Sequence, residues 1–313
     1  MARVAVVRGG RSLEREISLL SGHHVTTALR HLGHDVAELD VDADLARALA
    51  SVDVAFITLH GRDGEDGTIQ LTCEALGISY TGSGPLTCRL CFDKGLAKGS
   101  LRRAGLPTPP GYVVSAEAVR HMGAGTALKL AADRLGFPLA VKPAAQGSAL
   151  GLGVIDDPSD LSSAVMAALD HGERVLLERF VAGTEIAIAV AGPDLEPLPP
   201  VEIRTRGGIF DFETRVSPGG FELVCPADVA AEPLARARAL AHDACATLGV
   251  RDFGRVDLRI GDEGPVILDV KTCPGLTETS ILPLAASQAG STFEDFVNGV
   301  VEAALTRAPT ART

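Results

Sequence analysis

The chain contains no tryptophan and only 2 tyrosines among its 313 residues. Stacking on unpaired bases needs aromatic rings, so this scarcity disfavours a binder of single-stranded nucleic acid. Basic residues are outnumbered too, with 29 Lys and Arg against 40 Asp and Glu, for a net charge of -11. A dedicated nucleic-acid binder neutralises phosphates with a basic surface, so we expect no nucleic-acid partner and at most a local basic pocket.

Long apolar runs are also missing. Because no window of about 18 residues is uninterruptedly apolar, we expect no membrane-spanning helix and no membrane partner. The chain begins almost directly with the strand-like run Val4 to Val7 and shows no basic and apolar leader, which predicts a cytoplasmic protein. The 6 cysteines are scattered, and only Cys88 and Cys91 have metal-like spacing, without a second pair to complete a zinc site. We expect reduced thiols in apolar surroundings.

At this length, with 46% hydrophobic residues, the chain fits two or three packed lobes. The first 60 residues alternate strand-like and helix-like runs, and this βαβ pattern predicts a parallel sheet. The helix that opens near Ser12 is expected to carry one apolar face, with Ile17, Leu20, His24, Val25, Ala28, Leu29 and Leu32. The proline-rich segment 106–111 marks a lobe boundary, and strands dominate after it.

Two segments near the C-terminus combine charge with strand periodicity. Residues 254–260 and 266–272 flank Gly261-Asp262-Glu263-Gly264, which predicts a hairpin. Folding about Glu263 places Asp257 opposite Asp269 and Arg255 opposite Lys271 on one face. The other face is expected to be apolar and to consist of Val256, Leu258, Ile260, Leu268 and Val270.

Like charges that face each other weaken a sheet, so we expect ligands between them. A divalent cation on the two carboxylates and a phosphate on the two cations would satisfy both pairs, which indicates a magnesium–nucleotide site. The competing interpretation is a solvated surface of mixed charge, which is common on strands.

Three longer motifs accompany the hairpin. They are GGRSLEREIS at 9–18, HGRDGEDGTIQ at 60–70 followed by YTGSG at 80–84, and TCPGLT at 272–277 with Ser280 and Pro283. In this order they resemble the D-alanine–D-alanine ligase family of ATP-grasp enzymes, from about Val4 to Val301. Each motif alone is a weak pattern, whereas three long ones in the family's order are specific.

The resemblance implies an α/β fold with the three-lobed ATP-grasp architecture. Residues 1–93 would form an N-terminal parallel α/β lobe, 94–182 a central α+β lobe, and 183–313 a C-terminal catalytic α+β lobe. ATP would lie between the last two lobes. The implied reaction activates a carboxylate as an acyl phosphate, which an amine then attacks.

The resemblance also implies a role for each matching residue. On the nucleotide side, it implies that Lys94 and Lys142 contact the phosphates and that Gly147 belongs to the loop that closes over them. The linker that binds adenine would contain Glu178, Arg179 and Val181, and Glu185 would contact the ribose hydroxyls. Asp257 and Asp269 would bind Mg²⁺. On the amino-acid side, it implies that Glu14, oriented by Ser148, receives the ammonium group of the first substrate, and that His60 and Arg215 contact substrate. Arg255 and the backbone amide of Gly275 would stabilise the tetrahedral intermediate. Ser280 would contact the carboxylate of the second substrate. For His60, a structural histidine held by the glycine-rich loop is the alternative.

The chain departs from the family at one pocket. Asp269-Val270-Lys271 stands where the family has Glu-X-Asn, and lysine cannot coordinate a metal. One of two Mg²⁺ positions is then lost or taken over by the ammonium group, so we expect one or two ions. Val216 replaces a tyrosine of the lid, and Gln146 replaces a glutamate, which leaves the second substrate open.

The sequence thus predicts an ATP-dependent ligase that forms D-alanyl-D-alanine for peptidoglycan precursors from small amino-acid substrates. One alternative is a paralogue that uses another amine or second substrate. A second is a degenerate protein that binds nucleotide without catalysis, although Lys94, Lys142, Arg255, Asp257 and Glu14 are all retained. Because the family is commonly dimeric through its N-terminal lobe, a homodimer is expected.

Overall fold

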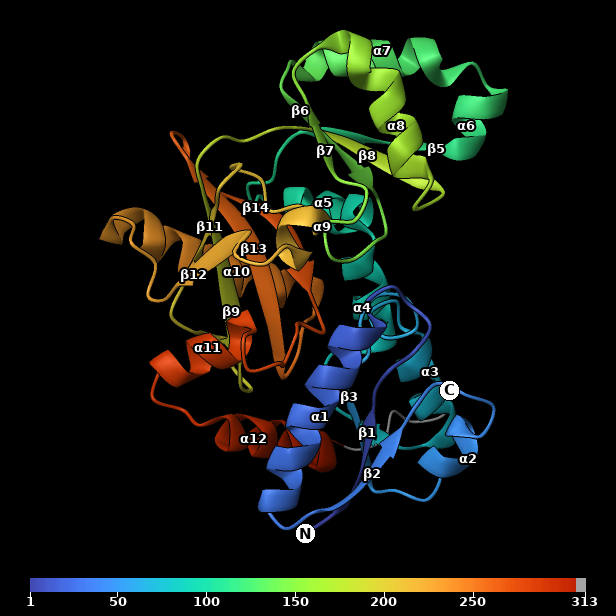
Figure 1. Cartoon of the computed structure of the whole chain (residues 1–313), viewed down its shortest axis with the longest axis vertical. Helices are drawn as coiled ribbons and strands as arrows, with labels where there is room; N and C mark the ends of the chain where they lie inside the picture. Colours follow the sequence, from blue (N-terminus) through green and yellow to red (C-terminus); the bar gives the residue numbers. More distant parts are fainter. Residues whose placement is uncertain (308–313) are drawn as a thin grey trace.

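The structure is a computed structural model that describes residues 1–307, except for the side chains of Ala124 and Val216. The last part of the predicted C-terminal lobe, 308–313, lies outside the described residues. Three sheets follow one another along the chain, each with its own helices (Figure 1). The predicted fold class, an α/β chain with one parallel lobe and two α+β lobes, is confirmed.

The first sheet, sheet A, is parallel and has the strand order β2-β1-β3-β4. Its central run Val4 to Val7 is fully buried, because helices cover both faces of a βαβ sheet and leave no polar side. The strands are β1 (Arg3–Val7), β2 (Asp35–Leu39), β3 (Val54–Ile57) and β4 (Ser79–Tyr80). Its helices are α1 (Arg15–His31), α2 (Leu45–Leu49) and α3 (Thr68–Leu76). The next two, α4 (Pro85–Phe92) and α5 (Lys94–Arg103), pack against the third sheet and its helix.

Helix α1 begins at Arg15, three residues after the predicted start, and only part of its predicted face is buried. Ile17 and Leu20 are 43% and 60% exposed, whereas Val25 and Leu29 are fully buried. The prediction for Ile17 and Leu20 was therefore wrong. His24 packs flat on Phe293, with ring centroids 3.8 Å apart, and its Nδ1 lies 2.8 Å from the carbonyl oxygen of Leu276. The helix thus turns one side to the C-terminal part of the chain and leaves an apolar edge open.

The second sheet, sheet B, is antiparallel and has the order β5-β8-β6-β7. Its helices gather on one side of the sheet, at the top of Figure 1. The strands are β5 (Gly111–Ser115), β6 (Leu139–Pro143), β7 (Gly153–Ile155) and β8 (Arg174–Arg179). The helices are α6 (Ala116–His121), α7 (Ala124–Leu135), the short 3₁₀ helix Pro158–Asp160 and α8 (Leu161–Leu169).

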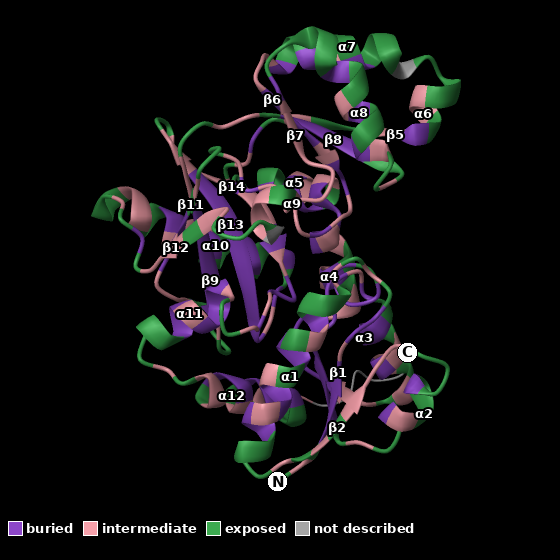
Figure 2. Ribbon diagram, in the orientation of Figure 1, coloured by how far each residue is buried: buried purple, intermediate pink, exposed green. Residues whose placement is uncertain are grey.

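The third sheet, sheet C, has six strands in the order β12-β11-β9-β13-β14, with β10 paired to β9. Figure 2 shows β9 and β13 as continuous buried ribbons at its centre. The strands are β9 (Thr184–Ala191), β10 (Glu196–Pro197), β11 (Val201–Thr205), β12 (Phe221–Val224), β13 (Phe253–Gly261) and β14 (Gly264–Lys271). The helices are α9 (Phe212–Val216), α10 (Ala231–Leu248), α11 (Ile281–Gln288) and α12 (Phe293–Thr306).

Helix α12 returns to the first sheet. It packs beside α1 and against β3 and β4, and its Val297 and Val301 share one core cluster with Val4 and Val6 (Figure 1). The end of the chain therefore ties the C-terminal lobe to the N-terminal one. The lobe boundaries expected from the sequence stay predictions.

Candidate active site

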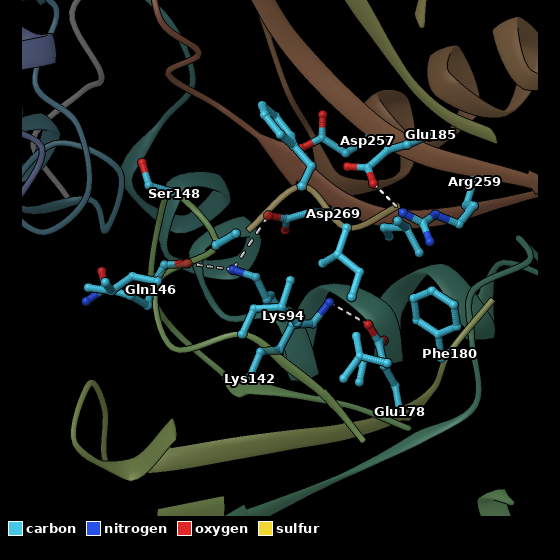
Figure 3. Close-up of a pocket in the computed structure, with 18 of the residues that line it drawn as sticks. Lys94, Lys142, Gln146, Ser148, Glu178, Phe180, Glu185, Asp257, Arg259 and Asp269 are labelled. Carbon is cyan, nitrogen blue, oxygen red and sulfur yellow. Dashed lines mark hydrogen bonds and ion pairs between the residues drawn. The ribbon is translucent and has the colours of Figure 1, made fainter. Parts of the chain in front are cut away.

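Two adjacent pockets contain nearly all the residues that the sequence singled out. The first, the inter-sheet cleft, lies between sheets B and C (Figure 3). The second, the α1 pocket, lies where α1, the loop after β3 and the segment after β14 meet. The predicted residues in the cleft are Lys94, Lys142, Ser148, Glu178, Arg179, Val181, Glu185, Arg215, Asp257, Asp269 and Lys271. Those in the α1 pocket are Glu14, His60, Ser148, Arg215, Arg255, Lys271, Gly275 and Ser280.

The two pockets share a boundary. Ser148, Phe210, Arg215 and Lys271 line both of them. A group bound in the cleft and a group bound in the α1 pocket would therefore meet beside these side chains. Gly147 lines neither pocket, but a Cβ atom placed on it would collide with the carboxylate of Glu14.

The predicted pairing of the charged hairpin is confirmed, through a β-bulge that the sequence pattern does not predict. Strands β13 and β14 pair Asp257 with Asp269, whereas Leu258 pairs with Ile267, so Leu268 is the extra residue. The bulge puts Leu268 on the same side as Asp269, where it lines the cleft. The prediction that Leu268 belongs to the apolar face was wrong, and the fully buried Ile267 takes that place.

Charges on the hairpin are neutralised along each strand. Arg255 donates from Nε and Nη2 to the two carboxylate oxygens of Asp257, at 2.7 and 2.8 Å. On β14, Nζ of Lys271 lies 3.2 Å from Oδ2 of Asp269, and Nζ of Lys94 lies 3.5 Å from the same oxygen. Each carboxylate has a cation two residues along its own strand. The facing like charges therefore do not by themselves require a ligand.

Asp269 is the electrostatic centre of the cleft. Burial raises its pKa, but the charges of Lys271, Lys94 and Lys142 outweigh burial and hold this pKa below its ordinary value. Burial also lowers the pKa of Lys94, since its ammonium group lies out of water beside two other lysines. Asp269 therefore stays ionised among three cations, which suits a site for a highly charged anion.

A buried ion-pair cluster forms the end of the cleft near sheet B. Glu178 is paired with Lys142 and with Lys98, whose Nζ lies 2.8 Å from Oε2 of Glu178 (Figure 3 shows the Lys142 contact). Nζ of Lys98 also donates to Oγ1 of Thr108 at 3.0 Å. Burial lowers the pKa of Lys98 to about 8, against the opposing effect of Glu178. Lys98 was not assigned from the sequence, although it lies one helical turn after Lys94 on α5 and that spacing could have identified it.

A second pair bounds the cleft on sheet C. Nη2 of Arg259 donates to Glu185, and Nη1 donates to the carbonyl oxygen of Val181 at 3.3 Å. The guanidinium group lies 5.1 Å from the ring centroid of Phe180. Burial raises the pKa of Glu185, although Arg259 opposes this shift. Arg259 was not assigned from the sequence, yet it shares the period-two face of Arg255 and Asp257.

The loop after β6 joins the two pockets. Nζ of Lys94 donates to the carbonyl oxygen of Gln146 at 2.7 Å, and Oγ of Ser148 donates to the carboxylate of Glu14. Ser148 and Ala149 have φ values of 49° and 55°, in the left-handed region that non-glycine residues seldom adopt. The loop thus connects Lys94 of the cleft to Glu14 of the N-terminal lobe, while the role of Ser148 in orienting Glu14 stays a prediction.

Arg215 reaches the boundary between the pockets from α9. Its guanidinium carbon lies 4.0 Å from the centroid of the Phe210 ring. Its Nε is buried and finds no hydrogen-bond partner among residues 1–307. Burial lowers the pKa of this side chain. Arg215 therefore presents donors to a ligand, whereas the side chain of the neighbouring Val216 lies outside the described part of the chain.

His60 is held by the protein on both ring nitrogens. Nδ1 lies 3.1 Å from the carbonyl oxygen of Cys273, and Nε2 lies 3.3 Å from Oγ of Ser21. Burial lowers its pKa, so the ring is neutral at neutral pH. Both interpretations of His60 have support, since it lines the α1 pocket and also fixes the segment after β14.

Glu65, which the sequence analysis left without a role, lies beside His60. It is 6% exposed, and burial raises its pKa to about 7. Its Oε1 lies 4.0 Å from Nδ1 of His60, and the charge of Lys271 opposes the effect of burial on this pKa. It accepts no side-chain hydrogen bond from any residue that the structure describes. A buried carboxylate of this kind is a typical feature of a ligand site.

The end of the α1 pocket opposite Glu14 is a tight turn. Oγ of Ser280 accepts a hydrogen bond from the backbone N–H of Thr277 at 3.1 Å and bonds to the hydroxyl group of that residue at 2.8 Å. A Cβ atom on Gly275 would lie 2.8 Å from Oγ of Ser280. Glycine at 275 therefore permits a close approach, and the hydroxyl group of Ser280 supports the turn in addition to facing the pocket.

A hard divalent cation fits the carboxylate pair. Asp257 and Asp269 are register partners and both line the cleft. Each carboxylate keeps free lone pairs beyond its protein contacts, which suits one ion completed by phosphate oxygens and water. No group of three His, Cys, Asp or Glu side chains with metal-site geometry occurs within residues 1–307. Cys88 and Cys91 are free and buried, as predicted, and burial raises the pKa of Cys88 to about 12.

Comparisons with known proteins agree with this arrangement. The family model for the D-ala D-ala ligase N-terminus matches residues 36–83, and the model for the C-terminus matches residues 101–302. The D-alanine–D-alanine ligase of Desulforudis audaxviator is 40% identical over 312 residues, which is 97% of this chain and 99% of the relative. That of Bordetella pertussis is 40% identical over 300 residues, covering 94% and 92%.

Solved structures give the same result. A D-alanine–D-alanine ligase from Bacillus anthracis complexed with ATP superposes with a TM-score of 0.83 and 27% identity, over 97% of this chain and 98% of that one. The VanG D-Ala:D-Ser ligase from Enterococcus faecalis has a TM-score of 0.83 and 26% identity, over 96% and 98%. The chain belongs to the D-alanine–D-alanine ligase family.

Proposed function

We propose that this protein is an ATP-dependent ligase that joins two D-alanine molecules for peptidoglycan precursors. The observation that supports this most directly is the shared boundary of the two pockets at Ser148, Arg215 and Lys271. A triphosphate in the lysine-rich cleft and an amino acid in the α1 pocket would place a phosphorus atom beside a carboxylate.

The reaction has two steps. A carboxylate oxygen of the first D-alanine attacks the γ-phosphorus atom of ATP, and ADP leaves. The amine of the second D-alanine then attacks the acyl carbon, phosphate leaves, and the nitrogen loses a proton. Two steps of this kind need close positioning and stabilisation of developing negative charge.

The residues of the cleft act on the nucleotide. Lys94 and Lys142 bind the phosphates, and Glu178 orients Lys142 through their buried ion pair. Glu185 contacts the ribose, and the backbone near Val181 contacts the adenine. Asp257 and Asp269 would hold Mg²⁺, which when bound withdraws negative charge from the phosphate oxygens.

The residues of the α1 pocket act on the amino acids. Glu14, oriented by Ser148, receives the ammonium group of the first substrate. Arg255 and the backbone N–H of Gly275 stabilise the oxyanion of the tetrahedral intermediate. Ser280 contacts the carboxylate of the second substrate while it also supports the turn at Thr277.

The rim of the α1 pocket favours a second candidate, a ligase with another amine as second substrate. Ile17, Leu20, Phe212 and Leu223 line the pocket, so much of its wall is apolar. A side chain larger than methyl would gain contacts with such a wall. The non-catalytic alternative has no such support, because the chain belongs to a ligase family and its predicted catalytic residues converge on two joined pockets.

The test is an assay of the purified protein with ATP, Mg²⁺ and D-alanine, followed by phosphate release and product mass. The expected result is a D-alanyl-D-alanine product with one phosphate per peptide bond. A panel that adds D-serine, D-valine and D-lactate as second substrates separates the two candidates. Absence of the D-alanine dipeptide at millimolar substrate would sink the leading proposal.

Two further expectations belong to this proposal. One is a homodimer formed through the N-terminal lobe, as the family resemblance implies. The chain would work in the cytoplasm, where ATP is available. No helix in residues 1–307 is long and apolar enough to cross a membrane.

A further inference from the structure

Lys271 occupies the boundary between the inter-sheet cleft and the α1 pocket. It lies at the end of β14 and lines both pockets, and its side chain is 14% exposed. Its charge interacts with those of Asp269, Glu65 and Glu14. If the function proposed above holds, the phosphoryl group passes from ATP to the amino acid at this boundary, directly beside the ammonium group.

The surroundings of Asp269 leave little room for two added cations. Its Oδ2 already has two ammonium groups, that of Lys271 at 3.2 Å and that of Lys94 at 3.5 Å. Its Oδ1 accepts a hydrogen bond from the backbone N–H of Val270 at 3.1 Å. Across the hairpin, both oxygens of Asp257 are bound by Arg255. One ion between the two carboxylates uses their remaining lone pairs.

A second ion bound to Oδ2 of Asp269 would meet the ammonium groups of Lys271 and Lys94. The ammonium group has three donors and no lone pair, so it repels a cation and cannot coordinate it. The same group attracts phosphate oxygens, since lysine binds phosphate as a point charge. Lys271 thus supplies positive charge at the position where a second ion would lie.

We propose that Lys271 is a catalytic residue that contacts the phosphoryl group during transfer, and that its ammonium group replaces a second divalent cation, so that the loaded site holds one ion. This inference rests on the proposed function. It assigns to one side chain of β14 a task that a metal ion could otherwise perform.

The direct test counts metal ions on the folded protein. Mn²⁺ is titrated into enzyme saturated with the non-hydrolysable analogue adenylyl imidodiphosphate, and electron paramagnetic resonance reports bound Mn²⁺ per site. The expected count is one for the wild type and two for Lys271→Asn, because asparagine offers a neutral oxygen ligand. Lys271→Met, which offers neither charge nor ligand, is the matched control and is expected to bind one.

Turnover supplies an independent readout. Lys271→Met is expected to lower kcat by about 100-fold, the usual loss when one group that stabilises the transition state is removed. Free Mg²⁺ above the ATP concentration should then raise kcat for Lys271→Asn but not for Lys271→Met. Circular dichroism and thermal unfolding show whether each variant is folded, and the wild-type count depends on no variant.

The outcomes separate this inference from the proposed function. Two Mn²⁺ ions per wild-type site, or full turnover by Lys271→Met, would overturn the role of Lys271 and leave the ligase proposal standing. Failure of the wild type to bind the metal–nucleotide at all would overturn both.

Discussion

The two pockets differ in how their charges are satisfied. In the inter-sheet cleft, each of the carboxylates Glu178, Glu185 and Asp269 has a cation of the protein as partner. In the α1 pocket, Glu65 has no Lys or Arg within ion-pair distance among the described residues, and its Oε1 lies 4.0 Å from Nδ1 of the neutral His60 ring. Buried polar groups without partners cost free energy. The carboxylates of the cleft are therefore neutralised by cations of the protein, whereas that of Glu65 in the α1 pocket is not.

This difference matches the chemistry of the proposed ligands. ATP is large and presents many groups, so a cleft with its side chains already fixed loses little order when ATP binds. D-alanine is small and brings one ammonium and one carboxylate group, for which Glu14 and Ser280 are the proposed contacts. The comparison can be tested by making the same chemical change, Glu to Gln, in each pocket.

Glu178→Gln should have the largest effect on stability. The substitution removes the carboxylate that Lys98 and Lys142 share and leaves two buried ammonium groups without a counter-charge. Breaking a buried pair in this way costs about 3–5 kcal/mol. We expect a clear fall in the urea midpoint and a loss of affinity for the nucleotide analogue. Glu263→Gln, in the exposed turn of the hairpin, is the control and should leave the midpoint unchanged.

Glu65→Gln should stabilise the folded protein at high pH, in contrast to the loss of stability expected for Glu178→Gln. The pKa of Glu65 is about 7 in the folded protein against 4.5 for the free group, because burial disfavours the charged form. The folded state therefore holds this proton more tightly. Its contribution to stability is full below about pH 4.5 and is lost as pH rises through about 7. The difference corresponds to about 3 kcal/mol.

The measurement is the free energy of unfolding of both proteins between pH 4.5 and 8. The wild type should lose stability relative to Glu65→Gln across this range, whereas Glu178→Gln should be less stable than the wild type at every pH. A parallel pH dependence for the wild type and Glu65→Gln would show that Glu65 is not buried without a partner, and the contrast between the pockets would fail.

Much of this arrangement could be predicted from the sequence, because patterns of period two and 3.6 reflect which side chains share a face. The pairing of Asp257 with Asp269 followed from symmetry about the turn. In the structure the turn is centred half a residue earlier than expected, since Gly261 pairs with Gly264. The extra residue Leu268 shifts the register back, so that Asp257 still pairs with Asp269. A bulge adds one residue to one strand, and no simple alternation of polar and apolar residues encodes it.

Other predictions from periodicity were wrong because periodicity does not show what a face contacts. Ile17 and Leu20 follow the helical period, but they face the α1 pocket and solvent instead of the core. Periodicity tells which residues share a side, and it does not tell whether that side meets a core or a ligand. Glu65 and Lys98 were missed because their importance comes from burial, which depends on the packing of whole lobes. Arg259, by contrast, could have been read from the alternation that identified Arg255 and Asp257.

The smallest expected effect concerns the loop that joins the two pockets. A methyl group on Gly147 would collide with the carboxylate of Glu14 and push it from Oγ of Ser148. Gly147→Ala should raise KM for the first D-alanine by ~10-fold, or about 1.4 kcal/mol, since Glu14 is the proposed ammonium contact. The dissociation constant of the nucleotide analogue should stay within about twofold, because the cleft keeps its own ion pairs.

Gly153→Ala is the matched control for this change. Gly153 follows the same loop, and a Cβ atom on it would meet nothing within 4 Å, so the kinetics of this variant should equal those of the wild type. Steady-state kinetics with D-alanine and calorimetry with adenylyl imidodiphosphate give the two constants separately. If Gly147→Ala weakened nucleotide binding as much as D-alanine binding, the loop would serve both pockets equally. The difference between the two pockets in how their carboxylates are neutralised would then not extend to the loop that connects them.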